Sequence, residues 1–213
     1  MTARYEHDSI RDQLSYRLRS LALLRQRLSL VGSQRVFAVG LSKTGTSSLT
    51  AALKLLGFRT RHFPIEMVGV DRGALTLRRS IAASYQSLTD TPVSALYRHL
   101  DTEFPGSKFI LTVRDIDGWL RSCETHFARA SWGRKIDLLH DYLYGGSRFD
   151  RRRFGESYER HVLGVEHYFQ DRTSELLVLD VIGGEGWERL CPFLDVPRPQ
   201  IDFPWANRTF VQS

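Results

Sequence analysis

The chain has little cysteine and no long hydrophobic run. Two cysteines occur among 213 residues, Cys123 and Cys191, far apart and outside any metal-binding spacing. This excludes a disulfide-stabilised scaffold and predicts a reducing compartment. The apolar runs, such as 36–41, are far shorter than the roughly 20 residues of a membrane-spanning helix. The first thirty residues carry many charges and no secretory signal pattern, so we expect a cytoplasmic protein without a membrane span.

Lysine is also scarce, at four of the 30 basic residues. With 24 acidic residues the net charge is +6, carried mainly by arginine. Arginine holds phosphate and sulfate well because its planar guanidinium offers two parallel hydrogen bonds. The excess is mild and spread along the chain, which favours an anionic ligand and no nucleic-acid partner. Hydrophobic residues at 42% and charged residues at 25% are typical of one globular domain of this length.

Short apolar segments alternate with helical patterns along residues 35–213. An amphipathic pattern at 8–30 predicts a helix within residues 1–34 that packs on this domain, with a membrane-surface or partner-binding helix as alternatives. Alternation of this kind predicts a single α/β domain, in which a parallel sheet of about five strands has helices on both faces. The expected strands are 35–39, 58–62, 86–89, 108–113 and 176–179. The expected helices are 46–56, 73–84, one capped by Thr91 with Pro92 at its first position, one from 117, a stretch over 132–171 and 187–194.

The first expected strand leads into a Gly- and hydroxyl-rich loop at 40–48. Such a loop before a helix turns backbone N–H groups inward and forms an anion cradle. The candidate binding residues here are Ser42, Lys43, Thr44, Gly45, Thr46 and Ser47. The spacing resembles the nucleotide-binding pattern G-x-x-x-x-G-K-[ST], but Thr46 stands where the lysine belongs and Lys43 lies inside the loop. This favours a nucleoside 5′-phosphosulfate over a triphosphate, with a turn that binds nothing as the alternative.

The strand at 108–113 delivers a second candidate, Arg114, to the carboxyl edge of the sheet. Ser122 follows near the start of the next helix, and the two side chains are suited to gripping one phosphate. Alternatively, Arg114 pairs with Asp115 or Asp117, and Ser122 is a solvated helix residue.

Taken together, the 41–48 loop and the Arg114–Ser122 pair resemble the P-loop sulfotransferases, which use 3′-phosphoadenosine 5′-phosphosulfate (PAPS). The motifs cover roughly residues 35–130. The resemblance implies a P-loop-type sheet and transfer of a sulfuryl group from PAPS to a hydroxyl or amine. It also implies that Lys43 stabilises the leaving 5′-phosphate and that Arg114 with Ser122 holds the 3′-phosphate. Arg208, beside Asn207, is expected to reach the 3′-phosphate or adenine, with a solvated arginine as an equal alternative. No metal is implied.

The resemblance also suggests where a general base lies. Asp90, in the segment 89–92, is placed like the catalytic base of some members, although many cytosolic members carry histidine there. His62 is placed where others carry a catalytic glutamate, and histidine has a suitable pKa. Glu66 ranks third. A helix-capping role for Asp90 and a half-buried structural role for His62 remain open.

The sequence does not identify the acceptor, which we expect to be a small molecule, glycan or lipid. The helical region 131–171 is expected to line its pocket, with Trp132, Tyr142 and Tyr144 as candidates. The arginine run around 151–153 is interpreted as a solvated face.

Two alternatives remain for the function. Asp180 after the strand at 176–179 resembles the magnesium-binding carboxylate of an ATP-dependent small-molecule kinase, and a non-catalytic nucleotide-binding protein would keep the cradle alone.

Overall fold

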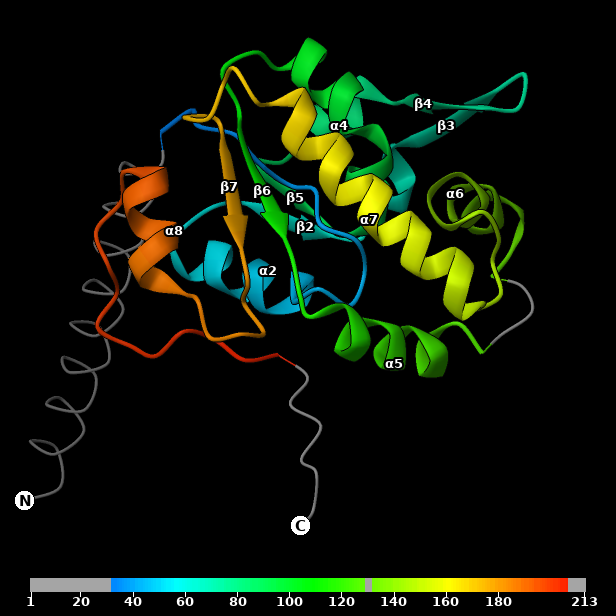
Figure 1. The fold of residues 1–213 in the computed structure, drawn as a ribbon. Coiled ribbons are helices and arrows are strands. Elements are labelled where there is room, and N and C mark those ends of the chain that lie inside the picture. The colour runs from blue at the N-terminus through cyan, green and yellow to red at the C-terminus, as the bar shows by residue number, and fades with distance from the viewer. Residues whose placement is uncertain (1–31, 129–131, 207–213) are drawn as a thin grey trace, which may run out of the picture.

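The computed structural model describes residues 32–128 and 132–206 (Figure 1). The predicted helix at 8–30, Asn207 and Arg208 lie outside these residues. Strands of the main sheet are β1 (Val36–Ala38), β2 (Thr60–His62), β5 (Ser87–Thr89), β6 (Lys108–Thr112) and β7 (Leu176–Leu179). The helices are α2 (Thr46–Leu55), α3 (Arg79–Ala83), α4 (Thr91–Glu103), α5 (Ile116–His126), α6 (Arg134–Tyr144), α7 (Arg151–Tyr168) and α8 (Trp187–Leu194).

The main sheet is parallel throughout, with the strand order β2-β5-β1-β6-β7. The predicted α/β fold with a five-stranded parallel sheet is therefore confirmed. Because the strands run in one direction, the residues that follow them meet at one edge: His62 is level with Thr89, and Thr112 with Leu179. After β5 the chain crosses to the other side of β1, so the loops after β1 and β6 flank the switch point where ligands of such sheets bind.

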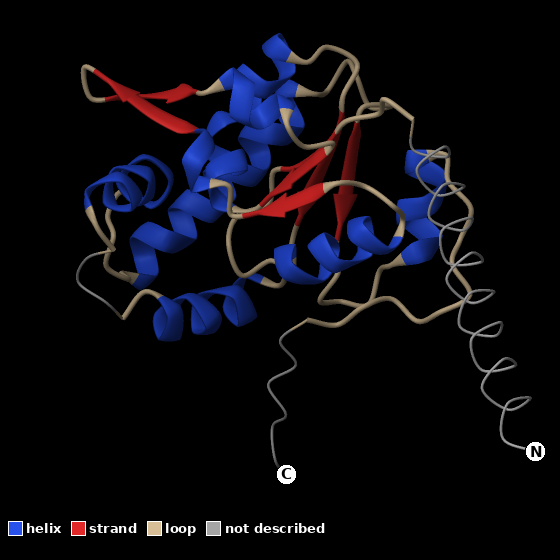
Figure 2. Ribbon diagram, turned by 180° about the vertical axis from the view of Figure 1, so that it is seen from behind, coloured by secondary structure: helices blue, strands red, loops and turns tan. Residues whose placement is uncertain are grey.

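Helices cover both faces of the sheet (Figure 2). Alternating strand residues divide the core in two, since neighbouring side chains of a strand point to opposite faces. Phe37, Phe109 and Leu111 belong to the cluster that includes residues of α4, α5 and α7. Val36, Ala38 and Ile110 belong to the cluster that includes residues of α2 and α8. Both β1 and β6 are thus buried on two sides, which fixes the positions of the loops that follow them.

Two predicted helical segments are wrong in detail. Residues 73–84 do not form one helix, because Ala74–Leu77 is strand β4 of an antiparallel hairpin with β3 (Val68–Asp71), reached through the 3-10 turn η1 (Ile65–Met67). Positive φ angles at Arg72 and Gly73 make the hairpin turn. The stretch 132–171 is two helices, α6 and α7, because α6 ends at Gly145 in the left-handed conformation.

The start of α4 also differs slightly from the prediction. Asp90 occupies the cap position, Thr91 is the first helical residue, and Pro92 follows it. No helix within residues 32–128 and 132–206 has the length and hydropathy needed to cross a bilayer.

Candidate active site

The loop between β1 and α2 forms an open cradle at the sheet edge. Gly45, the cap residue of α2, has a φ of 97°, and Lys43 has a φ of 75°, which L-residues rarely adopt. No side chain caps α2, and its first turn has no acidic residue. The helix therefore presents unsatisfied N–H groups and a partial positive charge, as an anion site requires. Gly40 brings the loop against β6, since a Cβ there would lie 1.9 Å from Thr112 Oγ1.

The hydroxyl groups of this loop do not all face a ligand. Thr44 is buried and its hydroxyl donates to the carbonyl of Leu41 at 2.6 Å, so its side chain holds the loop in shape. The Ser42 hydroxyl donates to Asp90 Oδ1 at 2.7 Å. Ser48 accepts a hydrogen bond from the N–H of Ala206 at 3.0 Å, which brings the C-terminal segment beside α2. Of the predicted contacts, those of Thr46, Ser47 and the loop N–H groups remain predictions.

Arg114 is held by contacts on both its backbone and its side chain. Its N–H donates to the Tyr158 hydroxyl at 2.8 Å, and that hydroxyl donates to its carbonyl at 2.7 Å. Its Nη1 donates to the carbonyl of Lys43 at 3.2 Å. A Cβ on Gly118 would lie 3.3 Å from Arg114 Nε, so this glycine leaves room for the guanidinium over the first turn of α5.

The neighbouring acids do not neutralise Arg114. Asp115 accepts a hydrogen bond from the N–H of Gly118 at 2.8 Å, and Asp117 pairs with Arg151 at 2.6 Å. Within residues 32–128 and 132–206, neither Lys43 nor Arg114 forms an ion pair. Two uncompensated cations beside a bare helix N-terminus favour binding of an anion with more than one charged group.

Ser122 lies in the second turn of α5, and its grip on a phosphate remains a prediction. The next residue, Cys123, is fully buried, and burial raises the pKa of its thiol far above the ordinary value. The positive charges of Lys43 and Arg114 oppose that rise. This segment of α5 therefore lies within the field of both cations.

Asp90 is held in a strained backbone conformation. Its φ of 81° and ψ of −178° fall in a region that is essentially restricted to glycine and costs about 1–3 kcal/mol. Its carboxylate does not cap α4. Instead, Oδ1 accepts from Ser42, and Oδ2 lies 3.3 Å from His62 Nε2. Strain of this kind is retained where the surrounding contacts fix a group for function.

His62 is engaged on both ring nitrogens. Nε2 faces Asp90, while Nδ1 lies 3.1 Å from the hydroxyls of both Thr50 and Thr89. Asp90 has spare capacity, because a carboxylate has about four acceptor positions and the structure occupies three, with Thr91 Oγ1 also donating to Oδ1 at 3.4 Å. The two candidates for the base are therefore one unit, in which the carboxylate has room for a further proton donor and the imidazole does not.

Two other sequence candidates, Glu66 and Asp180, have contacts that limit their roles. Burial favours a higher pKa for Glu66, but its hydrogen bond to Arg61 at 2.8 Å, a backbone hydrogen bond and the positive charge of Arg61 together outweigh burial and lower the pKa. Asp180 Oδ1 accepts from the N–H of Gly183 at 2.7 Å and so closes the turn after β7. No group of three or more His, Cys, Asp or Glu side chains suited to a metal occurs in the described part of the chain.

The acceptor candidates on α6 differ in exposure. Tyr144 is fully buried, and its hydroxyl lies 3.4 Å from Thr91 Oγ1, next to Asp90. Trp132 is half-buried, whereas Tyr142 is 64% exposed and lines no interior surface. Tyr144 and Trp132 thus remain candidates for the acceptor side, and the exposure of Tyr142 argues against that role. Sequence reasoning missed Thr50 and Tyr158, which are single polar residues without a motif, and did not single out Thr89 within the segment 89–92.

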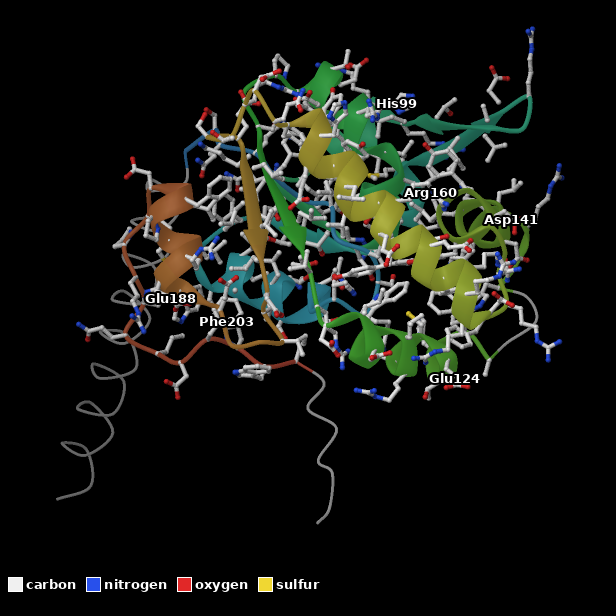
Figure 3. All side chains as sticks on the ribbon, viewed as in Figure 1. His99, Glu124, Asp141, Arg160, Glu188 and Phe203 are labelled. Atoms are coloured by element: carbon white, nitrogen blue, oxygen red, sulfur yellow. The ribbon has the colours of Figure 1, made fainter. Side chains whose placement is uncertain are left out.

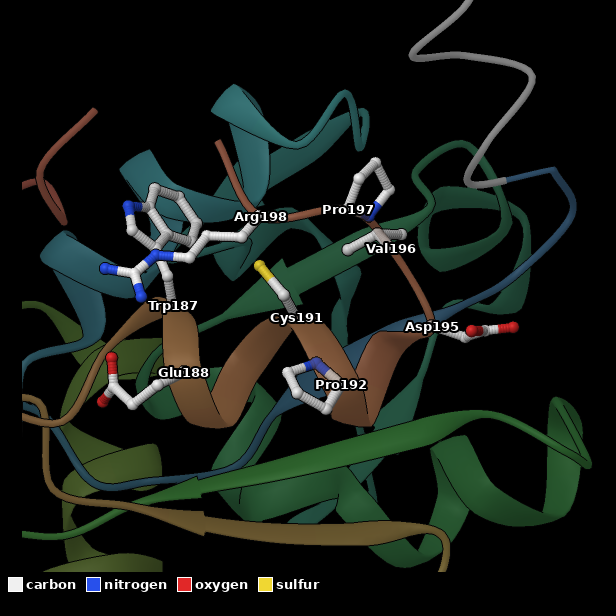
Figure 4. A pocket seen from close by; sticks show the side chains of 8 residues that line it. All are labelled: Trp187, Glu188, Cys191, Pro192, Asp195, Val196, Pro197 and Arg198. Atoms are coloured by element: carbon white, nitrogen blue, oxygen red, sulfur yellow. The ribbon is translucent and has the colours of Figure 1, made fainter. Parts of the chain in front are cut away.

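A separate groove of about 460 Å³ lies beside α8 (Figure 4). It is lined by Trp187, Glu188, Cys191, Pro192 and residues 195–198. None of the cradle residues takes part in it, so this groove is distinct from the candidate active site.

The fold and the cradle define a P-loop-type α/β protein with a candidate anion site at its switch point. Residues 35–210 match the family described as "Sulfotransferase domain", so the chain belongs to that family. It is also similar to "Ava biosynthesis cluster protein M" of Aspergillus versicolor, with 27% identity over 207 residues covering 80% of this chain and 79% of that protein.

Proposed function

We propose that the protein is a PAPS-dependent sulfotransferase that transfers a sulfuryl group in line to a hydroxyl or amine. The observation that carries this proposal is the contact between Arg114 and the loop that contains Lys43. The hydrogen bond of 3.2 Å from Arg114 Nη1 to the backbone carbonyl of Lys43 holds the Arg114 guanidinium against the loop that carries Lys43, and neither side chain forms an ion pair within residues 32–128 and 132–206. PAPS suits this site because it is anionic at both its 5′-phosphosulfate and its 3′-phosphate.

The two halves of the site fit the two ends of this nucleotide. The loop N–H groups and the Lys43 ammonium hold the 5′ end, where the helix N-terminus favours negative charge. Arg114, with Ser122, holds the 3′-phosphate and thereby selects PAPS over ATP. PAPS, when bound, supplies the sulfuryl group and leaves as adenosine 3′,5′-bisphosphate. Lys43 stabilises the negative charge that develops on the 5′-phosphate, which is electrostatic catalysis.

Asp90 accepts the proton of the attacking acceptor group. The strained backbone and the Ser42 contact aim its carboxylate, and His62 positions it through Oδ2. His62 is thus a positioning residue in this proposal. The relative named for a biosynthesis cluster supports a small-molecule acceptor.

Two competing functions are disfavoured. A kinase would need a lysine at position 46, where threonine stands, and a carboxylate free for magnesium, whereas Asp180 closes a turn. A non-catalytic nucleotide-binding protein would not need the strained Asp90–His62 pair beside the cradle. The family match supports a sulfotransferase over both.

Transfer of label from ³⁵S-PAPS to a panel of phenols, alcohols, amines and sugars tests the proposal. Lys43→Ala should lower transfer at least about 100-fold, because it removes the main stabilising charge. Lys54→Ala, on the exposed last turn of α2, is the matched control and should behave as the wild type. Undiminished transfer by Lys43→Ala would show that the assigned role of this lysine is wrong.

A further inference from the structure

One buried imidazole near the candidate base has no part in the proposed chemistry. His140, on α6, is 4% exposed, and its Nδ1 has no hydrogen-bond partner within the described residues. Burial lowers its pKa to about 4, so the ring is neutral at pH 7. A neutral imidazole has one donor and one acceptor nitrogen. A buried polar atom left unpaired is costly, and that cost calls for an explanation.

The surroundings of His140 are aromatic. Its ring centroid lies 5.0 Å from that of Phe127, 5.7 Å from Trp132 and 5.8 Å from Tyr144. The Phe127 and Trp132 contacts are edge-on, at 74° and 84°. Phe127 and Tyr144 are fully buried, so the half-buried Trp132 is the ring of this cluster with accessible apolar surface, which suits a flat, ring-bearing partner better than a flexible polar one.

This cluster lies next to the reaction centre. Tyr144 follows His140 by one helical turn, and its hydroxyl is 3.4 Å from Thr91 Oγ1, beside Asp90. The negative charge of Asp90 also acts on His140, together with those of Asp137 and Asp141, against the opposing effect of His126. Figure 3 shows Asp141 on α6. Acidic groups on several sides disfavour an anionic acceptor.

We propose that His140 is a specificity-determining residue of the acceptor site, and that the acceptor is a neutral, ring-bearing molecule with a second hydrogen-bonding group. That second group pairs with the His140 imidazole, while the acceptor hydroxyl faces Asp90 and the ring packs against Trp132. This inference rests on the proposed sulfotransferase function and narrows its acceptor class.

Three matched probes test it: 2-naphthol, 2,6-dihydroxynaphthalene and the anionic 6-hydroxy-2-naphthoate. Each is assayed by label transfer from PAPS, and binding of adenosine 3′,5′-bisphosphate is measured separately by thermal shift. We expect the wild type to have a KM for the dihydroxy compound about 5-fold or more below that for 2-naphthol, and the naphthoate to be the poorest acceptor. His140→Phe should bring the ratio of the KM for 2-naphthol to the KM for the dihydroxy compound close to one. His140→Asn keeps a polar group near Nδ1 and should restore part of the wild-type ratio.

His99→Phe, on the exposed far part of α4, is the matched control and should retain the wild-type ratio. A ratio unchanged in His140→Phe, a preference for the naphthoate, or no transfer to either neutral probe while the bisphosphate still stabilises the protein would overturn the inference and leave the donor site intact. Loss of bisphosphate stabilisation in the wild type would instead refute the proposed function. Retained stabilisation in both His140 variants shows that they fold.

Discussion

The carboxylate of Asp90 meets three hydroxyl or imidazole groups from separate parts of the chain. Ser42 comes from the loop after β1, His62 from the end of β2, and Thr91 from the first turn of α4. Each contact fixes one direction of the carboxylate, and the strained φ of Asp90 is maintained by them together. The carboxylate is therefore held in place by the fold itself, as its proposed role in proton transfer requires.

Substitutions of Asp90 and of His62 should lower the activity to different extents. Asp90→Asn should lower kcat about 100-fold or more, because the amide cannot accept the acceptor proton. His62→Gln should retain more activity than His62→Ala, because glutamine keeps a donor near Asp90 Oδ2. Steady-state kinetics with saturating PAPS measure both. Equal activity of His62→Gln and His62→Ala would argue against a positioning contact.

The sequence predicted these two residues but not their relation. Asp90 and His62 are candidates because each follows a strand, and parallel strands end at one edge. Their contact depends on the pairing of β2 with β5, which brings His62 level with Thr89. No local pattern encodes that pairing. His140 had no sequence signal at all, because its role depends on which rings surround it.

At the scale of elements, the position of the loop after β1 is set by its close approach to β6. Gly40 leaves space for the Thr112 side chain, and Ser94 of α4 donates to the Gly40 carbonyl at 2.6 Å. Tyr158 then ties α7 to the end of β6 through both backbone groups of Arg114. Three elements thus fix the distance between the two halves of the proposed nucleotide site.

Gly40→Ala should destabilise the protein. Its Cβ would lie 1.9 Å from Thr112 Oγ1 and 2.5 Å from the Thr112 carbonyl oxygen, so backbone must move. We expect a loss of about 1–3 kcal/mol in the free energy of unfolding, measured by urea denaturation. Gly155→Ala is the contrasting control: no atom lies within 4 Å of its Cβ inside α7, and alanine there should add about 0.5–1 kcal/mol. A neutral Gly40→Ala would contradict the close packing of β1 and β6.

The elements that sequence reasoning misplaced are also informative. The hairpin β3–β4 has alternating apolar residues on either side of Arg72-Gly73, a period-two signal that the helical interpretation of 73–84 overlooked. The helical stretch over 132–171 was predicted without its internal break, although Gly145 is a typical helix stop. The strands with strong β-forming runs, such as β6 and β7, were predicted almost to the residue.

At the scale of the whole molecule, stability should depend on pH through two histidines. Burial lowers the pKa of His140 and of His161 to about 4, while the Nε2–H of His161 donates to the Val39 carbonyl at 2.7 Å. The unfolded chain binds protons at about pH 6.5 that the folded chain does not. The free energy of unfolding should therefore be highest above pH 6.5 and fall as the pH is lowered toward 4, by about 1.4 kcal/mol per unit of pKa difference at each site.

Urea denaturation between pH 7 and pH 5 measures this slope, above the ordinary range of carboxylates. His161→Phe removes one of the two protonation sites and should reduce the slope. A free energy of unfolding independent of pH in this interval would show that the imidazoles are not held neutral by the fold.

The proposed joint binding of one nucleotide by Lys43 and Arg114 is most directly tested by calorimetric titration with adenosine 3′,5′-bisphosphate and with adenosine 5′-monophosphate, both in EDTA. We predict that the wild type binds the bisphosphate at least about 10-fold more tightly without magnesium, because Arg114 pairs with the 3′-phosphate. Arg114→Ala should bind the two nucleotides with nearly equal affinity. Equal affinity in the wild type, or binding only when magnesium is added, would contradict the account.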